Sequence, residues 1–380
     1  MRCGYQNSHR KHNRETKQLL KNVQGSPMNN GLERLGYSNW QRTVSAENIQ
    51  AGFSVARVTE VNKNGYVVAD GEREMPAEPS GKFLFNAEDG ADYPTVGDWV
   101  VIQTVDDHSL AVVHTVLPRK TLLKRKQAGR HIEFQLIAAN IDIGLVVQSA
   151  QSININLLDR YFVMLHDGGI QPIAVFSKVD LLSSSELEDL RSTLSMRHNR
   201  YVLISSITEK GVEEVTNLLE PRKTYCLLGQ SGVGKTSLLN CLLRTNAFKV
   251  SEVREKDGKG RHTTVRRQLI CLESGGIFID TPGMRELGNF DIADGLDETF
   301  EDLSSRAQKC RFRDCTHTHE TGCAVIEAVE NGDIDKSRYE NFLKLKKESE
   351  FYEMSYQEKR KKEKSFGKMV KNFKKIKKKK

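Results

Sequence analysis

The sequence predicts a multi-domain protein with three folded parts: a small antiparallel β-barrel, a central α/β domain with a parallel sheet, and a helical C-terminal module built around a metal. Three observations lead to this prediction. Short alternating segments fill residues 46–120, continuous apolar runs separated by helical patterns fill residues 121–290, and cysteine and histidine cluster within residues 291–345. A chain of 380 residues is long enough for two or three cores.

The two ends of the chain differ from these parts in composition. Residues 1–45 are polar and lack sustained periodicity, so we expect a flexible extension there. Residues 346–380 are expected to form a basic helix and tail, because residues 343–380 hold 16 Lys and Arg but 5 Asp and Glu. The net charge of +8 comes from this block, and the rest of the chain is slightly acidic. The block is either a solvated end or a surface for a phosphate backbone.

The composition argues against a membrane or secreted protein. No stretch approaches the roughly 20 consecutive apolar residues of a membrane-spanning helix. The first residues are basic and polar with no apolar run behind them, which is not a secretory signal. We therefore expect a cytoplasmic protein without a membrane partner.

Alternating apolar segments predict the barrel. They read FSVARVTEV, GYVVADG, GKFLF, GDWVVIQTV and SLAVVHTVLP, with NKNG, EPSG and YPTVGD between them. Frequent β-branched residues and regular Gly, Asn and Pro punctuation are typical of short antiparallel strands. An oligonucleotide-binding (OB) barrel fits the length and the number of strands, and a purely structural or dimerising β domain fits the pattern equally well.

Continuous apolar runs predict the parallel sheet. They read IDIGLVVQS, QPIAVFS, RYVLISS, KTYCLLG, QLICL and GIFID, and helical patterns separate most of them. Strands that helices cover on both faces have this composition, so we expect a mainly parallel sheet.

A phosphate-binding loop follows the strand TYCLL. The segment GQSGVGKT, residues 229–236, matches G-x-x-x-x-G-K-[ST] in full and opens the helical run SLLNCLL. Lys235 is expected to reach the β- and γ-phosphates, and Thr236 to place its hydroxyl on Mg²⁺, so both are also candidate catalytic residues. The stretch expected to contact nucleotide is Gly229, Gln230, Ser231, Gly232, Val233, Gly234, Lys235, Thr236 and Ser237.

The segment DTPG, residues 280–283, ends the strand GIFID. An acidic residue at the tip of a strand beside the phosphate loop is in the position that binds Mg²⁺, directly or through water, which assigns Asp280. The backbone N–H of Gly283 is then placed to contact the γ-phosphate. On its own DTPG could be an ordinary turn, but paired with the upstream loop it indicates a P-loop nucleoside triphosphatase (NTPase).

The segment SKVD, residues 177–180, resembles the N/T-K-x-D element with which GTPases bind guanine. Asp180 can accept from the ring N–H and the exocyclic amine of guanine, an arrangement that adenine lacks. Lys178 would pack along the nucleotide, and Ser177 and Val179 complete the element. The strand end LISS places Ser205 as a second candidate contact to the base. These assignments favour GTP over ATP, although a P-loop ATPase is an alternative.

These elements occur in an unusual order, because Asp180 and Ser205 precede Lys235 and Lys235 precedes Asp280. A doubly wound sheet tolerates such a circular permutation, since the same strand ends still meet at the ligand. We therefore predict a circularly permuted P-loop GTPase domain that hydrolyses GTP to GDP with Mg²⁺.

The segment GRHTT, residues 260–264, lies where the first switch of a GTPase belongs. Thr263 and Thr264 are candidates for a second hydroxyl on Mg²⁺, and His262 is the candidate for orienting the attacking water, because Met284 follows DTPG where GTPases often have Gln. Alternatively, the segment is a basic loop that contacts RNA.

Three thiols and one imidazole follow within a short segment, as Cys310, Cys315, His317 and Cys323. Structural zinc sites use this ligand set with four closed positions, so we expect one structural Zn²⁺. His319 is an alternative to His317, and a disulfide would leave an odd thiol.

Together these motifs resemble the circularly permuted, ribosome small-subunit-dependent GTPases of bacteria, the RsgA/YjeQ type. The resemblance extends from about Gly52 to the end of the zinc module and includes VGDWV (96–100), QLIAANID (135–142), GQSGVGKT, GRHTT, DTPG and C-x4-C-x-H-x5-C. It implies an OB barrel, a permuted GTPase domain and a zinc module that grip the small ribosomal subunit and its rRNA near the decoding region.

The same resemblance implies a role in late maturation of the subunit, with hydrolysis stimulated by the subunit. We expect a monomer. The alternative is an rRNA-binding module whose nucleotide site is vestigial, which the intact Lys235, Thr236 and Asp280 disfavour.

Overall fold

The computed structural model describes residues 30–46, 49, 52–62, 65–105, 109–126, 134–197, 200–244, 267–280 and 295–353. They divide into two compact units. The first combines residues up to 153 with residues 169–289, and the second combines residues 154–168 with residues from 290 onward. The described helices include none that a lipid bilayer would accommodate as a spanning segment.

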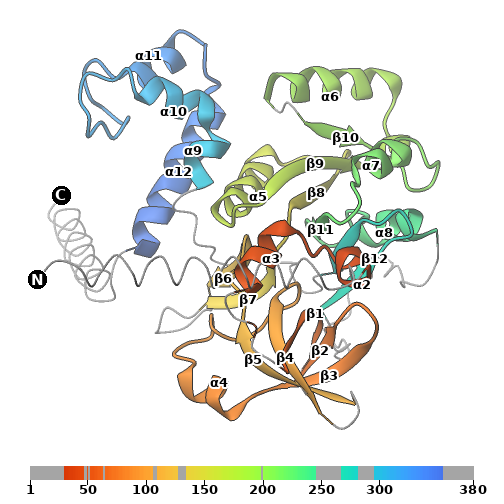
Figure 1. Cartoon of the computed structure of the whole chain (residues 1–380). Coiled ribbons are helices and arrows are strands. Elements are labelled where there is room, and N and C mark those ends of the chain that lie inside the picture. Colours follow the sequence, from red (N-terminus) through yellow and green to blue (C-terminus); the bar gives the residue numbers. More distant parts are fainter. Residues whose placement is uncertain are drawn as a thin grey trace, which may run out of the picture. The chain divides into compact units, whose positions relative to one another are not determined.

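A closed five-stranded barrel forms the first part of the first unit (Figure 1). Its strands are β1 (Ser54–Asn62), β2 (Gly65–Ala69), β3 (Glu74–Pro79), β4 (Trp99–Val105) and β5 (Leu110–Val116). They pair in the order β1-β2-β3-β5-β4, and β4 pairs again with β1 to close the barrel. This is the OB-type arrangement, so the predicted barrel is confirmed.

One predicted strand of the barrel is wrong. The segment GKFLF forms helix α4 (Gly81–Asn86), because the Ser80 hydroxyl caps the first turn by accepting a hydrogen bond of 3.1 Å from the Phe83 N–H. The strand lies just upstream, in β3, where Met75 and Ala77 are buried while the residues between and beside them are exposed or half-buried. The two prolines and two glutamates of EMPAEP concealed this alternation.

Residues 30–46 also depart from the sequence-based expectation. They form α2 (Asn30–Arg34) and α3 (Asn39–Ala46) rather than part of a flexible extension. Leu35 and Tyr37 belong to an apolar cluster with Trp99, and the two aromatic rings meet edge to face at 5.0 Å. The polar sequence hid these few apolar anchors, which are enough to fix the segment against the barrel.

The central sheet continues directly from the barrel. Parallel strands β8 (Ile143–Ser149), β9 (Gln171–Ser177), β10 (Tyr201–Leu203), β11 (Thr224–Leu228) and β13 (Ile277–Asp280) lie in the order β10-β9-β8-β11-β13. The mainly parallel sheet predicted from the apolar runs is confirmed.

One antiparallel strand joins this sheet to the barrel. β12 (Arg267–Cys271) pairs with β13 on one side and with β1 on the other, so that eleven strands form one continuous sheet. The remaining elements of the first unit are β6 (Leu122–Lys126), β7 (Phe134–Ala139), the 3₁₀ turn η1 (Val179–Leu181), α6 (Ser184–Arg197), α7 (Val212–Leu218) and α8 (Lys235–Leu243). Val215 of α7 and Leu238 of α8 pack in the same core as β8, β9 and β11.

The motifs VGDWV and QLIAANID meet where the barrel joins the central sheet. Gly97 has φ of +89°, and a Cβ there would lie 2.2 Å from the carbonyl oxygen of Ala139, so only glycine fits. The Asn140 amide donates to the Gly97 carbonyl, and its oxygen accepts from the Lys120 N–H. Asp98 is fully buried and accepts two hydrogen bonds of 2.9 Å from Arg119. Both motifs are therefore structural here.

The second unit consists of helices. They are α5 (Ile155–Asp167), α9 (Gly295–Thr299), α10 (Glu301–Ala307), α11 (Ala324–Glu330) and α12 (Lys336–Glu353). Although α5 connects two strands of the central sheet in sequence, it clusters with the C-terminal helices, so the expected range 121–290 is not one compact unit. Helix α12 also runs across the expected boundary between residues 345 and 346.

A buried polar network joins α5 to α12. Asp159 is fully buried and accepts hydrogen bonds from Asn341, at 3.0 Å, and Arg338, at 3.5 Å. Arg338 also donates twice to Asp302, at 2.8 Å each, and lies 4.7 Å from the centre of the Phe300 ring. A buried carboxylate needs such partners, so α5 is held firmly in this unit.

Candidate nucleotide site and candidate metal centre

The loop between β11 and α8 has the backbone shape of a phosphate-binding loop. Gly229, Gly232 and Gly234 have φ of +135°, +77° and +96°, a region that other residues rarely adopt. A Cβ on Gly229 would lie 2.2 Å from the carbonyl oxygen of Val147, so the loop also touches the neighbouring strand β8. The N-terminal end of α8 faces the loop and favours an anion there.

Lys235 starts α8, and its ammonium group lies over the loop. Its Nζ donates to the carbonyl oxygens of Gly229, at 2.7 Å, and Gln230, at 2.6 Å. Thr236 follows in the first turn of the same helix and is half-buried. These two side chains thus lie at the end of α8 where a phosphate chain binds in P-loop proteins.

Asp280 lies at the last position of β13, beside the strand that leads into the loop. Burial raises the pKa of this carboxyl group above its ordinary value, and the positive charge of Lys235 acts in the opposite direction. A partly desolvated carboxylate near a lysine and at the end of a parallel strand is suited to a hydrated divalent cation.

Ser177 joins the guanine-binding candidates to the phosphate loop. It ends β9, and its hydroxyl lies 2.5 Å from the carbonyl oxygen of Val233 and 3.2 Å from that of Gln148. A Cβ on Gly234 would lie 3.5 Å from the same hydroxyl. The segment SKVD and the segment GQSGVGKT, more than 50 residues apart in sequence, are therefore in direct contact.

The rest of SKVD turns outward from this contact. Lys178 adopts a left-handed conformation with φ of +61°, Val179 is buried, and Asp180 is exposed in the short turn η1. The left-handed conformation of Lys178 changes the direction of the chain. As a result, Ser177 is buried while Asp180, three residues later, is exposed. The Asp180 carboxylate is consequently accessible to a base.

The loop after β10 lies beside both elements. The Val179 N–H donates to the carbonyl oxygen of Ile204 at 3.2 Å, and the thiol of Cys241 in α8 lies 3.5 Å from that of Ser206. The Ser205 side chain is fully buried and accepts from the N–H groups of Ile207 and Thr208, so it stabilises its own turn. The Ser205 hydroxyl is therefore engaged within its own turn.

Ser177 stands where the N/T-K-x-D element has Asn or Thr, and its contact with the phosphate loop was not predicted from the sequence. The sequence signal for this contact is the combination of Ser177 with Gly234. A serine hydroxyl is short, so it can contact the loop backbone only where a glycine lets that backbone come close. Four other candidates, His262, Thr263, Thr264 and Gly283, lie outside the described residues.

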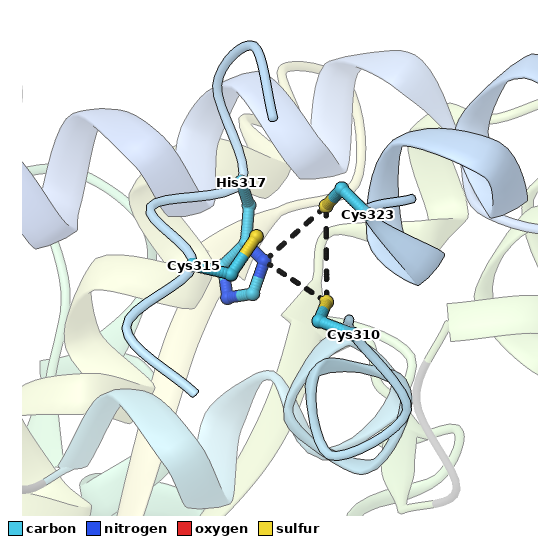
Figure 2. Close-up of side chains that lie close together, drawn as sticks. All are labelled: Cys310, Cys315, His317 and Cys323. Carbon is cyan, nitrogen blue, oxygen red and sulfur yellow. Dashed lines mark hydrogen bonds between the residues drawn. The ribbon is translucent and has the colours of Figure 1, made fainter. Parts of the chain in front are cut away.

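The metal-ligand candidates converge in the second unit (Figure 2). The Sγ atoms of Cys310 and Cys323 are 3.8 Å apart, and the His317 Nδ1 lies 3.6 Å and 3.4 Å from them. With Cys315, all four ligand atoms lie within 4.8 Å of one another. Tetrahedral Zn–S bonds of about 2.3 Å place sulfur atoms about 3.8 Å apart, so the donor set and its spacing fit zinc.

The surrounding chain holds His317 in this cluster. It has φ of +61°, and the Tyr339 hydroxyl donates to its carbonyl oxygen at 2.6 Å. The alternative ligand His319 is exposed, and its Nδ1 lies 2.8 Å from the Thr318 hydroxyl instead. His317, rather than His319, therefore completes the cluster.

The pKa values of two thiols of the cluster, Cys315 and Cys310, are shifted in opposite directions. Burial raises the pKa of Cys315 to about 12. Burial acts in the same sense on Cys310, but the backbone N–H groups of Ala324 and Val325 at the start of α11, together with the neighbouring thiols, lower its pKa overall. A cation bound among these sulfur atoms would favour the thiolate form of each.

Comparison with known proteins identifies relatives of this chain. Residues 116–290 match the family model described as RsgA GTPase. A protein of Oceanobacillus iheyensis named small ribosomal subunit biogenesis GTPase RsgA 1 is 36% identical over 302 residues, covering 79% of this chain and 86% of the relative. A Bacteroides thetaiotaomicron protein of the same name is 35% identical over 353 residues, covering 91% and 98%.

Two solved structures also resemble this chain. YjeQ from Thermotoga maritima superposes with a TM-score of 0.61 and 28% identity, covering 78% of this chain and 98% of that one. YloQ, described as a circularly permuted GTPase, superposes with a TM-score of 0.59 and 26% identity, covering 80% and 98%.

Proposed function

This chain belongs to the RsgA family of GTPases, and on that basis we propose that it hydrolyses GTP to GDP and phosphate while assisting late maturation of the small ribosomal subunit. The relatives carry small-subunit biogenesis in their names and match most of the chain. We further propose that it works as a cytoplasmic monomer whose partner is the small subunit and its rRNA.

One contact carries the proposal of a guanine nucleotide site. The Ser177 hydroxyl meets the Val233 carbonyl of the phosphate loop, which brings the exposed Asp180 and the ammonium of Lys235 to the same edge of the sheet. In an open parallel sheet, ligands bind at this edge, outside the carboxyl ends of the strands. Adenine would leave the Asp180 carboxylate without its two donors, so guanine is favoured.

The nucleotide would be held by the backbone of residues 229–237, with Lys235 on the β- and γ-phosphates. Thr236 and Asp280 would hold Mg²⁺, which neutralises phosphate charge when bound. The stem of Lys178 would pack along the nucleotide, and the backbone at Ser205 would contact the carbonyl group of the base. For hydrolysis we propose that His262 orients the attacking water, that Thr263 or Thr264 supplies a further hydroxyl to the cation, and that Gly283 contacts the γ-phosphate.

The second unit would serve as a zinc-stapled RNA-binding module. Cys310, Cys315, His317 and Cys323 would hold one structural Zn²⁺, and a closed four-ligand site leaves no position for catalysis. The barrel, the module and the basic residues 346–380 would together contact rRNA, whose phosphates favour a segregated block of positive charge.

The decisive experiment is GTP turnover by the purified protein with and without small ribosomal subunits. We expect the subunits to raise turnover at least tenfold, and Lys235→Ala to abolish both rates. The variant His262→Ala should lower stimulated turnover at least tenfold while GTP-analogue affinity stays within twofold of the parent. A rate that subunits leave unchanged would refute the assembly role, and binding of subunits without any turnover would instead support an rRNA-binding protein with a vestigial site.

A further inference from the structure

A second polar cavity lies at the edge of the sheet opposite the phosphate loop. It has a volume of about 310 Å³ and is lined by residues at the starts of β8 and β11, by the barrel and by the N-terminal helices. Thr224, which begins β11, contributes to the cavity, whereas Gly229 follows the end of the same strand. Five residues at about 3.3 Å each place the two sites roughly 16 Å apart.

The cavity collects more positive than negative charge. Five cationic and two carboxylate side chains line it, which leaves an excess of three positive charges. These side chains are Arg42, Arg57, Lys120, Arg222, Lys223, Glu33 and Asp142.

Each carboxylate lies between two cations. Glu33 is 2.6 Å from Arg42 and 2.9 Å from Arg222. Asp142 is 3.8 Å from Lys120 and 3.5 Å from Lys223. The four cationic side chains keep between 37% and 61% of their surface exposed, so a solute entering the cavity can reach them.

Arg57 supplies the fifth charge from the interior. It is 1% exposed, and its hydrogen bonds within the described residues all go to neutral oxygens, those of Leu35, Gly97, Asn140 and the Thr224 hydroxyl. Burial lowers the pKa of this guanidinium to about 10, although the negative charges of Asp142 and Asp98 act in the opposite direction. None of the Arg57 hydrogen bonds within the described residues is to a carboxylate, so an anion bound in the cavity would stabilise this buried cation further.

We propose that this cavity binds a phosphate-bearing anion, with Lys120 and Lys223 as its principal charged contacts and Arg42 and Arg222 as further cations of its lining. Paired arginine forks and lysine ammonium groups are the donors that phosphate oxygens prefer. The volume is at the lower end of the range for small-ligand sites, which suits a phosphate or a small phosphomonoester rather than a whole nucleotide. A bound anion would join the N-terminal helices, the barrel and the central sheet at one point.

The test uses the full chain with its nucleotide site filled by a non-hydrolysable GTP analogue and Mg²⁺, so that the phosphate loop cannot take the probe. Inorganic phosphate, ribose 5-phosphate and a ten-nucleotide single-stranded RNA are titrated separately, and affinity and the thermal midpoint are recorded. We expect saturable binding that weakens at least tenfold in the double variant Lys120→Gln/Lys223→Gln. The charge-retaining double variant Lys120→Arg/Lys223→Arg should keep affinity within threefold.

The matched control is Lys82→Gln/Arg191→Gln, which removes two exposed cations outside the cavity and should leave affinity within twofold. Binding of the small phosphates that depends on the two lysines supports a free phosphorylated ligand, whereas lysine-dependent binding of the RNA alone supports an RNA backbone phosphate. The proposal is overturned if none of the three probes binds saturably, or if both glutamine double variants lose the same affinity.

Discussion

Ser177 illustrates how a single hydroxyl can connect two distant motifs. Its oxygen contacts the Val233 carbonyl of the phosphate loop and the Gln148 carbonyl of β8. The side chain is short, but the left-handed Gly234 brings the loop backbone close enough for contact. A longer side chain at this position would have to displace the loop. The size of Ser177 and the glycines of the loop therefore depend on each other.

The burial of the Asp280 carboxylate affects the stability of the protein. Burial raises the pKa of its carboxyl group above the ordinary value. The ionised carboxylate therefore opposes folding of the nucleotide-free protein at neutral pH, and this opposition fades as the pH falls through the raised pKa. A cation bound at this position would reduce the same opposition.

We therefore predict opposite effects of Asp280→Asn on stability and on activity. The thermal midpoint of the nucleotide-free variant at pH 7 should rise by about 2–4 °C relative to the parent, which corresponds to about 1 kcal/mol in a unit of this size. Mg²⁺-dependent GTP turnover should fall at least a hundredfold. The measurements are calorimetric melting across pH and a phosphate-release assay.

The control is Asp189→Asn, an exposed carboxylate on α6 that should change neither quantity. The stability difference between Asp280→Asn and the parent should disappear at acidic pH, where both side chains are neutral. A variant that melts below the parent at pH 7 would contradict the electrostatic account.

At the scale of elements, the sequence predicted the type of most segments, but helices α2, α3 and α4 and strand β3 were not predicted, for physical reasons. Segments with continuous apolar runs, such as β8 and β9, were predicted correctly because strands buried on both faces must be apolar throughout. Helix α4 and strand β3 were exchanged, since the cap at Ser80 and the exposure of Phe85, at 89%, depend on surroundings that the local pattern does not reveal.

The nucleotide-site motifs were readable from sequence because their backbone geometry demands glycine. At Gly229, for example, a Cβ atom would lie only 2.2 Å from the carbonyl oxygen of Val147. The cavity around Arg57 was not readable, because its charges come from α2, α3, the barrel and the starts of two strands. No local spacing relates Arg42 to Lys223.

We expect the loop between α10 and α11 to depend on a bound metal more than on packing. It contains Cys310, Cys315 and His317, while Cys323 caps α11, and few apolar residues accompany them. We predict that Cys315→Ser lowers the zinc content from one per chain to near zero, because three ligands do not close a structural site. Metal analysis and circular dichroism of the purified variant check this.

The matched control for that variant is Cys271→Ser, which alters an exposed thiol outside the cluster and should retain one zinc per chain. Affinity for a GTP analogue should stay within twofold in both variants, because the nucleotide-site candidates belong to the other compact unit. Full zinc content in Cys315→Ser would show that the cluster has been assigned wrongly.

At the scale of the whole molecule, the permuted order of the motifs is compatible with a single site. The sheet brings the ends of its strands together whatever their order in the sequence. The order β10-β9-β8-β11-β13 puts the ends of β9, β11 and β13 along one edge. Ser177, Gly229 and Asp280 lie at or directly after those ends, which is where ligands bind in open parallel sheets.

The same continuous sheet extends into the barrel through β12 and β1. Strand pairing therefore connects the end of β13, through β12, to strand β1 of the barrel. We propose that Asp180 and the phosphate loop belong to a single guanine nucleotide site.

Equilibrium titration of GDP and xanthosine diphosphate against the parent and Asp180→Asn tests this claim most directly. Xanthine carries a carbonyl where guanine carries its amine, so the asparagine amide can donate where the aspartate accepted. We predict at least a hundredfold loss of GDP affinity and a gain in xanthosine diphosphate affinity for Asp180→Asn. An unchanged GDP affinity in this variant, with binding still abolished by Lys235→Ala, would contradict the account.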